Sequence, residues 1–366
     1  MNRLHRTAGV PSARAVLAAV LALAVLHFSF AAAPSASAVT MEAVVYHQYG
    51  AADVLHLEAL PKPTPADDSV LVRVHAASVN PYDWHFMRGT PYIVRMMVGL
   101  RRPKSPRLGV DFAGTVVGVG KHVAAFKPGD EVFGGHDGAF AQYVTVREHG
   151  SIALMPQRAT FEQAAAVPIA GVTALQALRD VGHLRAGERV LINGASGGVG
   201  TFAVQIAKAF GAEVTAVCST RNAALVRSIG ADHVIDYTRE DFTREPTRYD
   251  LVLDTVGNHG VLDYRRVLKP RGIAVMIGGG GARAREWIGP VFNMIELPVV
   301  SWFTSQKFVT FEASLEQRDL EYLANLIQLG KLTPVIDRRY PLAATAAAIT
   351  YLENGHARGK VVIDVQ

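Results

Sequence analysis

A glycine-rich segment at residues 191–202, LINGASGGVGTF, has the composition of a ligand-binding turn. It lies between a predicted strand and a predicted helix, with glycines spaced as G-x-x-G-x-x-G. Glycine permits a positive φ and a close approach of the backbone to a ligand, and the N-terminus of a helix attracts phosphate. A plain tight turn would also fit the spacing, but the strand–turn–helix order favours a pyrophosphate site. Its residues are Gly194, Ala195, Ser196, Gly197, Gly198, Val199 and Gly200.

The segment after the next predicted strand indicates which dinucleotide would bind. That strand, EVTAVCS (213–219), ends without an acid, and none occurs between Glu213 and Asp232. Strands that bind NAD usually end in an acid for the ribose 2′-hydroxyl. Polar and basic side chains that can bind a 2′-phosphate follow instead: Ser219, Thr220, Arg221 and Asn222. We expect NADPH rather than NADH, although Arg221 could also be an ordinary surface residue.

Strands and helices alternate from Phe161 onward. We expect strands at 189–194, 213–219, 233–237, 249–257 and 273–279, and helices at 198–211, 222–230 and 260–268. Helical runs at 161–182 are interrupted at Pro168. This alternation predicts an α/β domain with a doubly wound parallel sheet.

The sequence pattern before Phe161 is typical of a β-rich domain. Short strands separated by Pro, Gly and Asp are expected at 41–50, 54–60, 69–79, 110–120, 130–135 and 139–146. They predict a barrel-like or sandwich-like core. The C-terminal part returns to other elements, with a helix ending near Gly330, a second at 343–355 and a last strand at 360–365.

Composition excludes several classes of protein. The 366 residues include 37 Lys and Arg against 32 Asp and Glu, and the basic residues form no single cluster, so we expect no nucleic-acid partner. Cys218 is the one cysteine. A single thiol excludes an internal disulfide framework and a cysteine-rich zinc site.

The first forty residues stand apart from the rest. Basic residues precede an uncharged run from Ala15 to Ala33, and Ala36 and Ala38 form an A-x-A pattern. This layout predicts a signal peptide, which would make the protein exported, or an uncleaved membrane anchor. Alternatively, translation starts at Met41, in which case the protein is cytoplasmic and residues 1–40 are an upstream extension. Both interpretations stay open, and the segment is the expected place of any membrane contact.

Seven segments, the glycine-rich turn among them, carry a resemblance to a known family: NPYDW (80–84), GVDFAG (109–114), PGDEVFG (128–134), GAFAQYV (138–144), AVPIAGVTALQAL (166–178), INGASGGVG (192–200) and GHARGKVVI (355–363). With them the chain resembles the medium-chain dehydrogenase/reductase superfamily, in its zinc-free quinone oxidoreductase branch. The resemblance implies a GroES-like catalytic domain at 41–160, a Rossmann NAD(P)-binding domain at 161–310 and a return to the first domain at 311–366. It also implies a homodimer.

The resemblance bears on metal binding. Zinc-dependent relatives carry a Cys where this chain has Asn80, and a His-Glu pair where it has Val110 and Asp111. We therefore expect no metal site and no zinc, with Asp111 as a structural carboxylate. Without a Lewis acid, hydride transfer from NADPH to a quinone or an α,β-unsaturated carbonyl is easier than alcohol oxidation.

The candidate catalytic residues lie in the segment NPYDWHFMRGTPY (80–92). Tyr92 is the first choice as proton donor on the resemblance, followed by Tyr82 and His85; each could instead be a pocket wall. Asn80 is expected near the cofactor. By resemblance or by their place at strand ends, further cofactor contacts are Thr173, Tyr237, Gly257, Gly278 and Lys360.

The segment YIVRMMVGLRRPKSPR (92–107) departs from the family pattern. It could be a lid over a hydrophobic substrate, a membrane-surface contact or a plain loop. Two alternatives to the reductase function also stay open: an alcohol or aldehyde oxidoreductase, and a dinucleotide-binding protein with a partner or sensing role.

Overall fold

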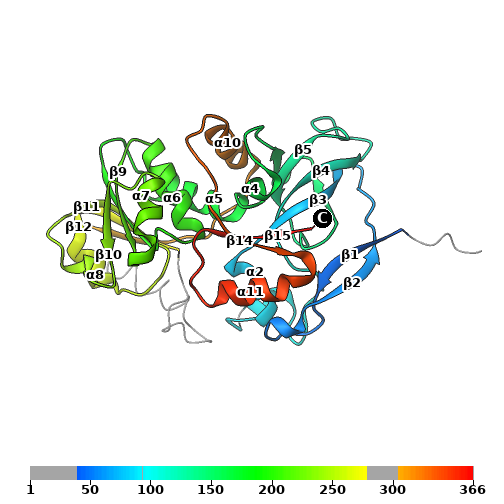
Figure 1. Ribbon diagram of the computed structural model, residues 1–366, viewed down its shortest axis with the longest axis horizontal. Coiled ribbons are helices and arrows are strands. Elements are labelled where there is room, and N and C mark those ends of the chain that lie inside the picture. The colour runs from blue at the N-terminus through cyan, green and yellow to red at the C-terminus, as the bar shows by residue number, and fades with distance from the viewer. Residues whose placement is uncertain (1–38, 93, 278–303, 366) are drawn as a thin grey trace, which may run out of the picture. The chain divides into compact units, whose positions relative to one another are not determined.

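The computed structural model describes residues 39–92, 94–277 and 304–365 (Figure 1). The predicted signal segment and Gly278 lie outside the described residues. Among the residues described, no helix is both long and apolar enough to cross a bilayer.

A six-stranded parallel sheet forms the second half of the fold. Its strands are β8 (Arg189–Asn193), β9 (Glu213–Cys218), β10 (His233–Asp236), β11 (Tyr249–Asp254), β12 (Leu268–Met276) and β13 (Lys307–Thr310). Their order is β10-β9-β8-β11-β12-β13, and every neighbouring pair is parallel. The order reverses between β8 and β11. A crevice at such a switch point is where open α/β sheets bind ligands, at the carboxyl ends of the strands.

Helices cover both faces of this sheet, as its alternating side chains require. Val190 and Ile192 of β8 pack in one buried cluster with Ile206, whereas Leu191 packs in another with Tyr264. The first face carries α5 (Pro168–Gln176), α6 (Gly198–Ala209) and α7 (Ala223–Ser228), and the second carries α8 (Val261–Val267). The predicted doubly wound α/β architecture is confirmed.

A second sheet supplies the GroES-like half, and it takes its last strands from the C-terminus. It contains β3 (Ser69–Val79), β4 (Asp111–Val119), β5 (Glu131–Gly135), β6 (Tyr143–Arg147), β7 (Ile152–Leu154), β14 (Ile336–Pro341) and β15 (Lys360–Asp364). The order is β14-β15-β3-β4-β5-β7, with β6 paired to β3. Because β15 pairs with β3, Lys360 lies beside the end of β3.

A separate hairpin joins β1 (Thr40–Val45) to β2 (His56–Pro61). Their antiparallel register pairs Val45 with His56. The remaining helices are α2 (Pro81–Arg88), α3 (Val94–Val98), α4 (Phe161–Ala165), α10 (Gln317–Gln328) and α11 (Thr345–Glu353). Short helical turns occur at Ala52–Val54, Ala177–Val181, Thr220–Asn222, Phe242–Arg244 and Leu342–Ala344.

Candidate cofactor and active site

The glycine-rich turn joins β8 to α6 at the switch point of the parallel sheet. Gly194 has a φ of 83°, and a Cβ there would overlap Thr255 Oγ1. A Cβ at Gly200 would overlap the carbonyl oxygen of Gly194 and lie 2.7 Å from the Cα of Ala195. Glycine is therefore needed at both positions, first for the left-handed turn and then for the close packing of helix against strand.

The N-terminus of α6 has the geometry of an anion-binding site. Its N-cap is Gly197, and no side chain caps it. The first N–H groups of a helix have no intrahelical acceptor, so those of Gly198, Val199 and Gly200 can bind a phosphate. Gly197 also forms a parallel bridge with Gly359, and a Cβ at Gly198 would lie 3.3 Å from Lys360 Cδ. The stem of Lys360 thus lies directly beside this N-terminus.

The residues predicted to bind the 2′-phosphate side gather next to the turn. The buried amide of Asn222 donates from Nδ2 to Ser196 Oγ (2.9 Å) and to Ser219 Oγ (3.2 Å). Asn222 Oδ1 is buried without a hydrogen-bond partner. Arg221 is exposed and donates to the carbonyl oxygen of His356 (2.9 Å). Asn222 therefore ties the loop after β9 to the glycine turn.

An acid that the sequence argument did not consider lies in this loop region. Asp236 ends β10, pairs with Cys218 and accepts a hydrogen bond from Thr220 Oγ1 at 2.5 Å. That bond, with those from Thr238, lowers the pKa of Asp236, so the carboxylate is ionised at neutral pH. No acidic residue occurs between Glu213 and Asp232 in the sequence. In the structure, however, the Asp236 carboxylate lies next to Thr220 of this stretch.

The other predicted cofactor contacts take different positions. Tyr237 follows Asp236 with a 59% exposed side chain, and its N–H donates to the carbonyl oxygen of Cys218 (3.1 Å). Gly257 follows β11 with a φ of 74°, and its N–H donates to the Asp254 carboxylate (3.1 Å). Thr173 is buried within α5.

A buried polar network lies where the adjacent strands β15, β3 and β4 of the second sheet meet. Lys360 Nζ donates to Asn80 Oδ1 (2.5 Å) and to the carbonyl oxygen of Val79 (3.2 Å), and it lies 3.4 Å from Asp111 Oδ2. Asn80 Nδ2 donates in turn to Asp111 Oδ2 (2.9 Å). Two predicted site residues, Asn80 and Lys360, are thereby in direct contact. Burial lowers the pKa of Lys360, and the neighbouring Asp111 opposes that shift.

Asp83 adds a second buried carboxyl at the start of α2. Its Oδ2 accepts the N–H of Asn80 (2.7 Å), while its Oδ1 is buried without a hydrogen-bond partner. Burial raises the pKa of Asp83 to about 8. Asn80 is thus held through its backbone by Asp83 and through its side chain by Asp111 and Lys360.

The residues at the position of the catalytic zinc in related enzymes do not fit a zinc ion. Asp111 Oδ2 accepts from Ser78 Oγ (2.8 Å) and Asn80 Nδ2, and Oδ1 accepts from the N–H of Ile169 (3.0 Å). The Lys360 ammonium lies against the same carboxylate. One fully engaged carboxylate and an amide, without a thiolate or an imidazole, are a poor ligand set for zinc.

A cavity of about 210 Å³ opens beside α2. Its lining includes Tyr46, Tyr82, Phe86, Leu108, Gly109 and Asp137, and from the segment at 92–107 also Val98, Pro103, Lys104, Ser105 and Arg107. Tyr82 stacks on Phe86 with ring centroids 3.9 Å apart. The segment that departs from the family pattern therefore forms part of the cavity wall.

The predicted proton donors differ in their relation to the cavity. Tyr82 lines it, and burial raises the pKa of its hydroxyl. His85 is absent from the lining; its Nδ1 lies 2.9 Å from the Thr90 carbonyl oxygen, and burial lowers its pKa. A neutral imidazole that donates from Nδ1 has only an acceptor at Nε2. Tyr92 is also absent from the lining, and its ring faces the guanidinium of Arg95 at 4.7 Å.

Sequence reasoning missed Tyr46. Its side chain is 3% exposed, it lines the cavity, and burial raises the pKa of its hydroxyl to about 12. The segment 41–50 was expected to be one continuous strand, but β1 ends at Val45. The chain leaves the hairpin at Tyr46, whose side chain points to the same cavity as Tyr82.

Comparisons with known proteins agree with this geometry. Residues 66–157 match the alcohol dehydrogenase GroES-like domain, and residues 229–363 match the zinc-binding dehydrogenase family. The chain is 33% identical over 341 residues to a chloroplast envelope quinone oxidoreductase homolog of Arabidopsis thaliana, covering 88% of this chain and 98% of that protein. It is 34% identical over 368 residues to the mitochondrial NAD(P)H oxidoreductase RTN4IP1 of Mus musculus, covering 90% and 91%.

A solved structure gives the same result. The quinone oxidoreductase from Coxiella burnetii superposes with a TM-score of 0.78 at 32% sequence identity, covering 90% of this chain and all of that one.

Proposed function

Because the chain belongs to the medium-chain dehydrogenase/reductase superfamily, in its quinone oxidoreductase-like branch, and is an oxidoreductase, we propose that it reduces quinones or α,β-unsaturated carbonyls with NADPH and without zinc. The observation that carries the proposal is the position of Lys360. Its stem lies against the glycine turn, and its ammonium binds Asn80 where related enzymes place a metal ligand. One residue thus links the cofactor side of the site to its reactive side.

The cofactor fits the turn. A Cβ at Gly194 or Gly200 would fill the space at the turn, and no side chain caps the N-terminus of α6. Both features suit a pyrophosphate. When bound, the nicotinamide supplies a hydride. The side chains of the protein then have to align the acceptor and stabilise the negative charge that develops on the acceptor oxygen.

Tyr82 and Tyr46 are the proposed hydrogen-bond donors to that oxygen. Both line the cavity, and their raised pKa values keep both hydroxyls protonated at neutral pH. Lys104 and Arg107 in the same wall add positive charge. His85 and Tyr92, outside the lining, are weaker candidates on this geometry.

The preference for NADPH rests on Ser219 and Arg221. Thr220 is a poorer candidate, because its hydroxyl binds the Asp236 carboxylate. Arg221 is exposed beside the loop and can turn from the His356 carbonyl oxygen to a phosphate. Asp236 opposes this preference, since an ionised carboxylate repels a 2′-phosphate.

Two further expectations remain predictions. A homodimer would form through the edge of the parallel sheet, which ends at β13 among the described strands. The place of action depends on whether residues 1–40 are a signal, an anchor or an upstream extension.

The decisive experiment follows absorbance at 340 nm with NADPH or NADH and a panel of a naphthoquinone, a benzoquinone, an enone and an aldehyde, each with and without a chelator. We expect oxidation of NADPH by quinone or enone that a chelator does not change. Tyr82→Phe should lower kcat. Arg221→Ala should reduce the NADPH/NADH ratio of kcat/KM by about tenfold or more, as for loss of a charge-assisted bond.

The control is Arg248→Ala, which removes an exposed arginine whose guanidinium donates to the backbone carbonyl oxygens of Glu245, Pro246 and Thr247. NADPH binding without turnover of any acceptor would favour a binding role instead. Chelator-sensitive aldehyde reduction would favour the alcohol dehydrogenase alternative.

A further inference from the structure

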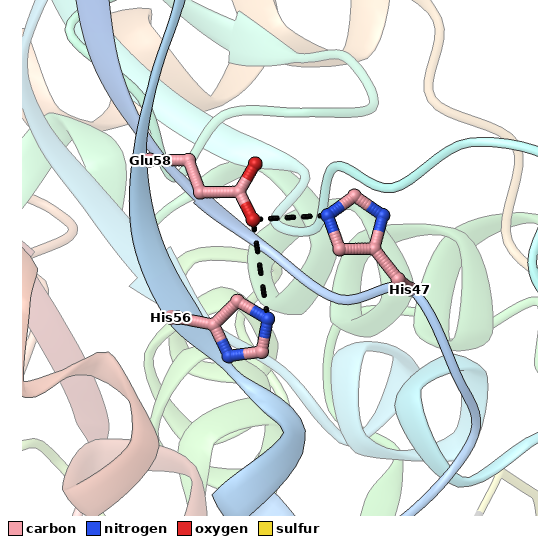
Figure 2. A group of neighbouring side chains, drawn as sticks. All are labelled: His47, His56 and Glu58. Carbon is pink, nitrogen blue, oxygen red and sulfur yellow. Dashed lines mark hydrogen bonds and ion pairs between the residues drawn. The ribbon is translucent and has the colours of Figure 1, made fainter.

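Three potential metal ligands meet on the β1–β2 hairpin, away from the network at Lys360. His56 and Glu58 are two residues apart on β2, so they point to the same face of the strand. His47 lies two residues beyond the end of β1, and the pairing of Val45 with His56 brings it next to them. Figure 2 shows the two imidazoles and the carboxylate pointing toward one another. We call His47, His56 and Glu58 the hairpin triad.

The distances within the hairpin triad suit a single ion. His47 Nε2 lies 2.9 Å from Glu58 Oε1, and His56 Nε2 lies 4.0 Å from the same oxygen (Figure 2). One ligand atom from each residue lies within 4.8 Å of the others. Tetrahedral zinc with bonds of about 2.0–2.1 Å holds its ligand atoms about 3.3 Å apart. The observed spacings bracket that value, so small rotations of exposed side chains would complete the site.

The backbone under the hairpin triad is fixed, while the side chains are free to adjust. Ala43 and Val45 of β1 are fully buried. The N–H groups of Val44 and Tyr46 donate to the carbonyl oxygens of Phe140 and Pro106, both at 2.8 Å. The triad side chains are 59%, 52% and 36% exposed for His47, His56 and Glu58. A metal ion would therefore meet ligands on a preformed scaffold with open access from solvent.

We propose that the hairpin triad is a binding site for a divalent first-row transition-metal ion, represented by Zn²⁺. Two imidazoles and one carboxylate form a ligand set that zinc, copper and nickel accept, whereas magnesium and calcium prefer oxygen ligands only. Three protein ligands leave one position for water or an added ligand. The site is separate from the Asn80–Asp111 region, whose residues do not fit zinc, and it was not expected from the sequence.

A bound ion would link the two strands across the hairpin loop. That loop begins with Tyr46, which lines the cavity, and includes the buried residues Ala52 and Val54. Linking His47 to β2 would hold this loop in place, and binding to the folded state alone stabilises a protein by mass action. Metal binding should therefore be visible as a higher melting temperature as well as in a direct titration.

The test uses the full chain without an affinity tag and ZnCl₂ as the probe, measured by equilibrium dialysis with metal analysis and by thermal melting. We expect saturable binding that His47→Gln and His56→Gln each weaken by about tenfold or more. Zinc should raise the melting temperature of the wild type but not of these two variants. MgCl₂ at the same concentration should not compete.

The matched control is His233→Gln. His233 Nε2 lies 2.9 Å from Glu213 Oε1, with side chains 60% and 38% exposed, so it reproduces the His47–Glu58 pair without a second imidazole. Zinc binding that persists in His233→Gln and is lost in both triad variants supports the site. Absence of saturable binding in the wild type, or an equal loss in all three variants, would overturn it.

Discussion

The buried carboxyl of Asp83 should make the stability of the protein depend on pH. Its carboxyl is fully buried, holds the N–H of Asn80 and faces no partner at Oδ1. Its pKa of about 8 in the folded protein compares with 3.8 for an ordinary Asp. Burial is the main cause and the charge of Asp111 adds to it, while the hydrogen bond from the Asn80 N–H and the charge of Lys360 oppose it.

This difference predicts a pH dependence of stability that Asp83→Asn should reduce. Between pH 4 and pH 8 the unfolded carboxyl is ionised while the folded one keeps its proton. The folded state then binds more protons, so the free energy of unfolding falls as the pH rises, by at most about 1.4 kcal/mol per pH unit. Urea denaturation at pH 5, 6, 7 and 8 measures the slope.

The Asn variant keeps an acceptor for the Asn80 N–H but cannot titrate. Its free energy of unfolding, relative to wild type, should therefore increase steadily from pH 5 to pH 8. Parallel pH profiles would show that Asp83 does not carry the shifted proton.

At the scale of single residues, the sequence indicated which types of residue the site would contain better than it indicated which residues contact one another. Asn222 donates hydrogen bonds to Ser196 and Ser219, and Asn80 meets Lys360 across 280 positions of the chain. Asp236 was missed because its place depends on the register of β10 against β9. That register is a tertiary property, which strand patterns alone do not encode.

At the scale of elements, the packing of α6 against β8 determines whether the turn can hold a phosphate. Gly200 sits in the first turn of α6, where its missing Cβ lets the helix approach the backbone of Gly194 and Ala195. We expect Gly200→Ala to push the helix away, destabilise the fold by about 1–3 kcal/mol and weaken NADPH binding. Fluorescence titration of NADPH and thermal melting measure the two effects.

Gly118→Ala is the matched control. Its Cβ would meet only the Leu71 side chain, no closer than 3.8 Å, and its φ is not positive. It should melt and bind NADPH like the wild type. If Gly200→Ala binds NADPH as tightly as Gly118→Ala, the close packing of α6 is not what forms the phosphate site.

Helix α2 was not predicted from the sequence, although the sequence contains signals for it. Its signals are local: Pro81 at the first helical position, Asp83 in the first turn and Gly89 as a left-handed C-cap with a φ of 59°. The helix carries Tyr82 to the cavity and is linked by Arg88 to α11, the helix that precedes β15.

The Arg88–Glu353 pair should stabilise this arrangement. Arg88 Nε and Nη2 donate to the two oxygens of Glu353 at 2.5 and 3.1 Å, with side chains 38% and 17% exposed. We expect Glu353→Gln to cost about 1 kcal/mol of unfolding free energy, since partial exposure of Arg88 screens the pair. Asp67→Asn, which breaks the more exposed pair with Lys121, should cost roughly 0–0.5 kcal/mol. Equal costs in urea denaturation would contradict this.

At the scale of the whole molecule, the site exists because the chain returns to its first sheet. The alternating pattern predicted the parallel sheet, and the motifs predicted the GroES-like half. The strand β15 lies beside β3 and brings Lys360 to Asn80, while Gly359 touches the glycine turn at Gly197. The cavity could not be predicted, because helix α2 and the end of α3 meet loop residues at 46, 103–109 and 137 there, and the packing of such loops has no periodic signal.

The same view bears on the start of the described chain, where β1 begins at Thr40. Val39 is 71% exposed, whereas Met41 is 3% exposed and packs with Ala43, Val45 and Ala141. A chain beginning at Met41 should therefore melt within about 2 °C of the full chain and turn over the same acceptors. A chain beginning at Tyr46 loses β1 and these buried side chains, at about 1.5–3 kcal/mol for each large one. Thermal melting of all three proteins tests this, and a Met41 chain that melts as low as the Tyr46 chain would show that residues 1–40 contribute to the fold.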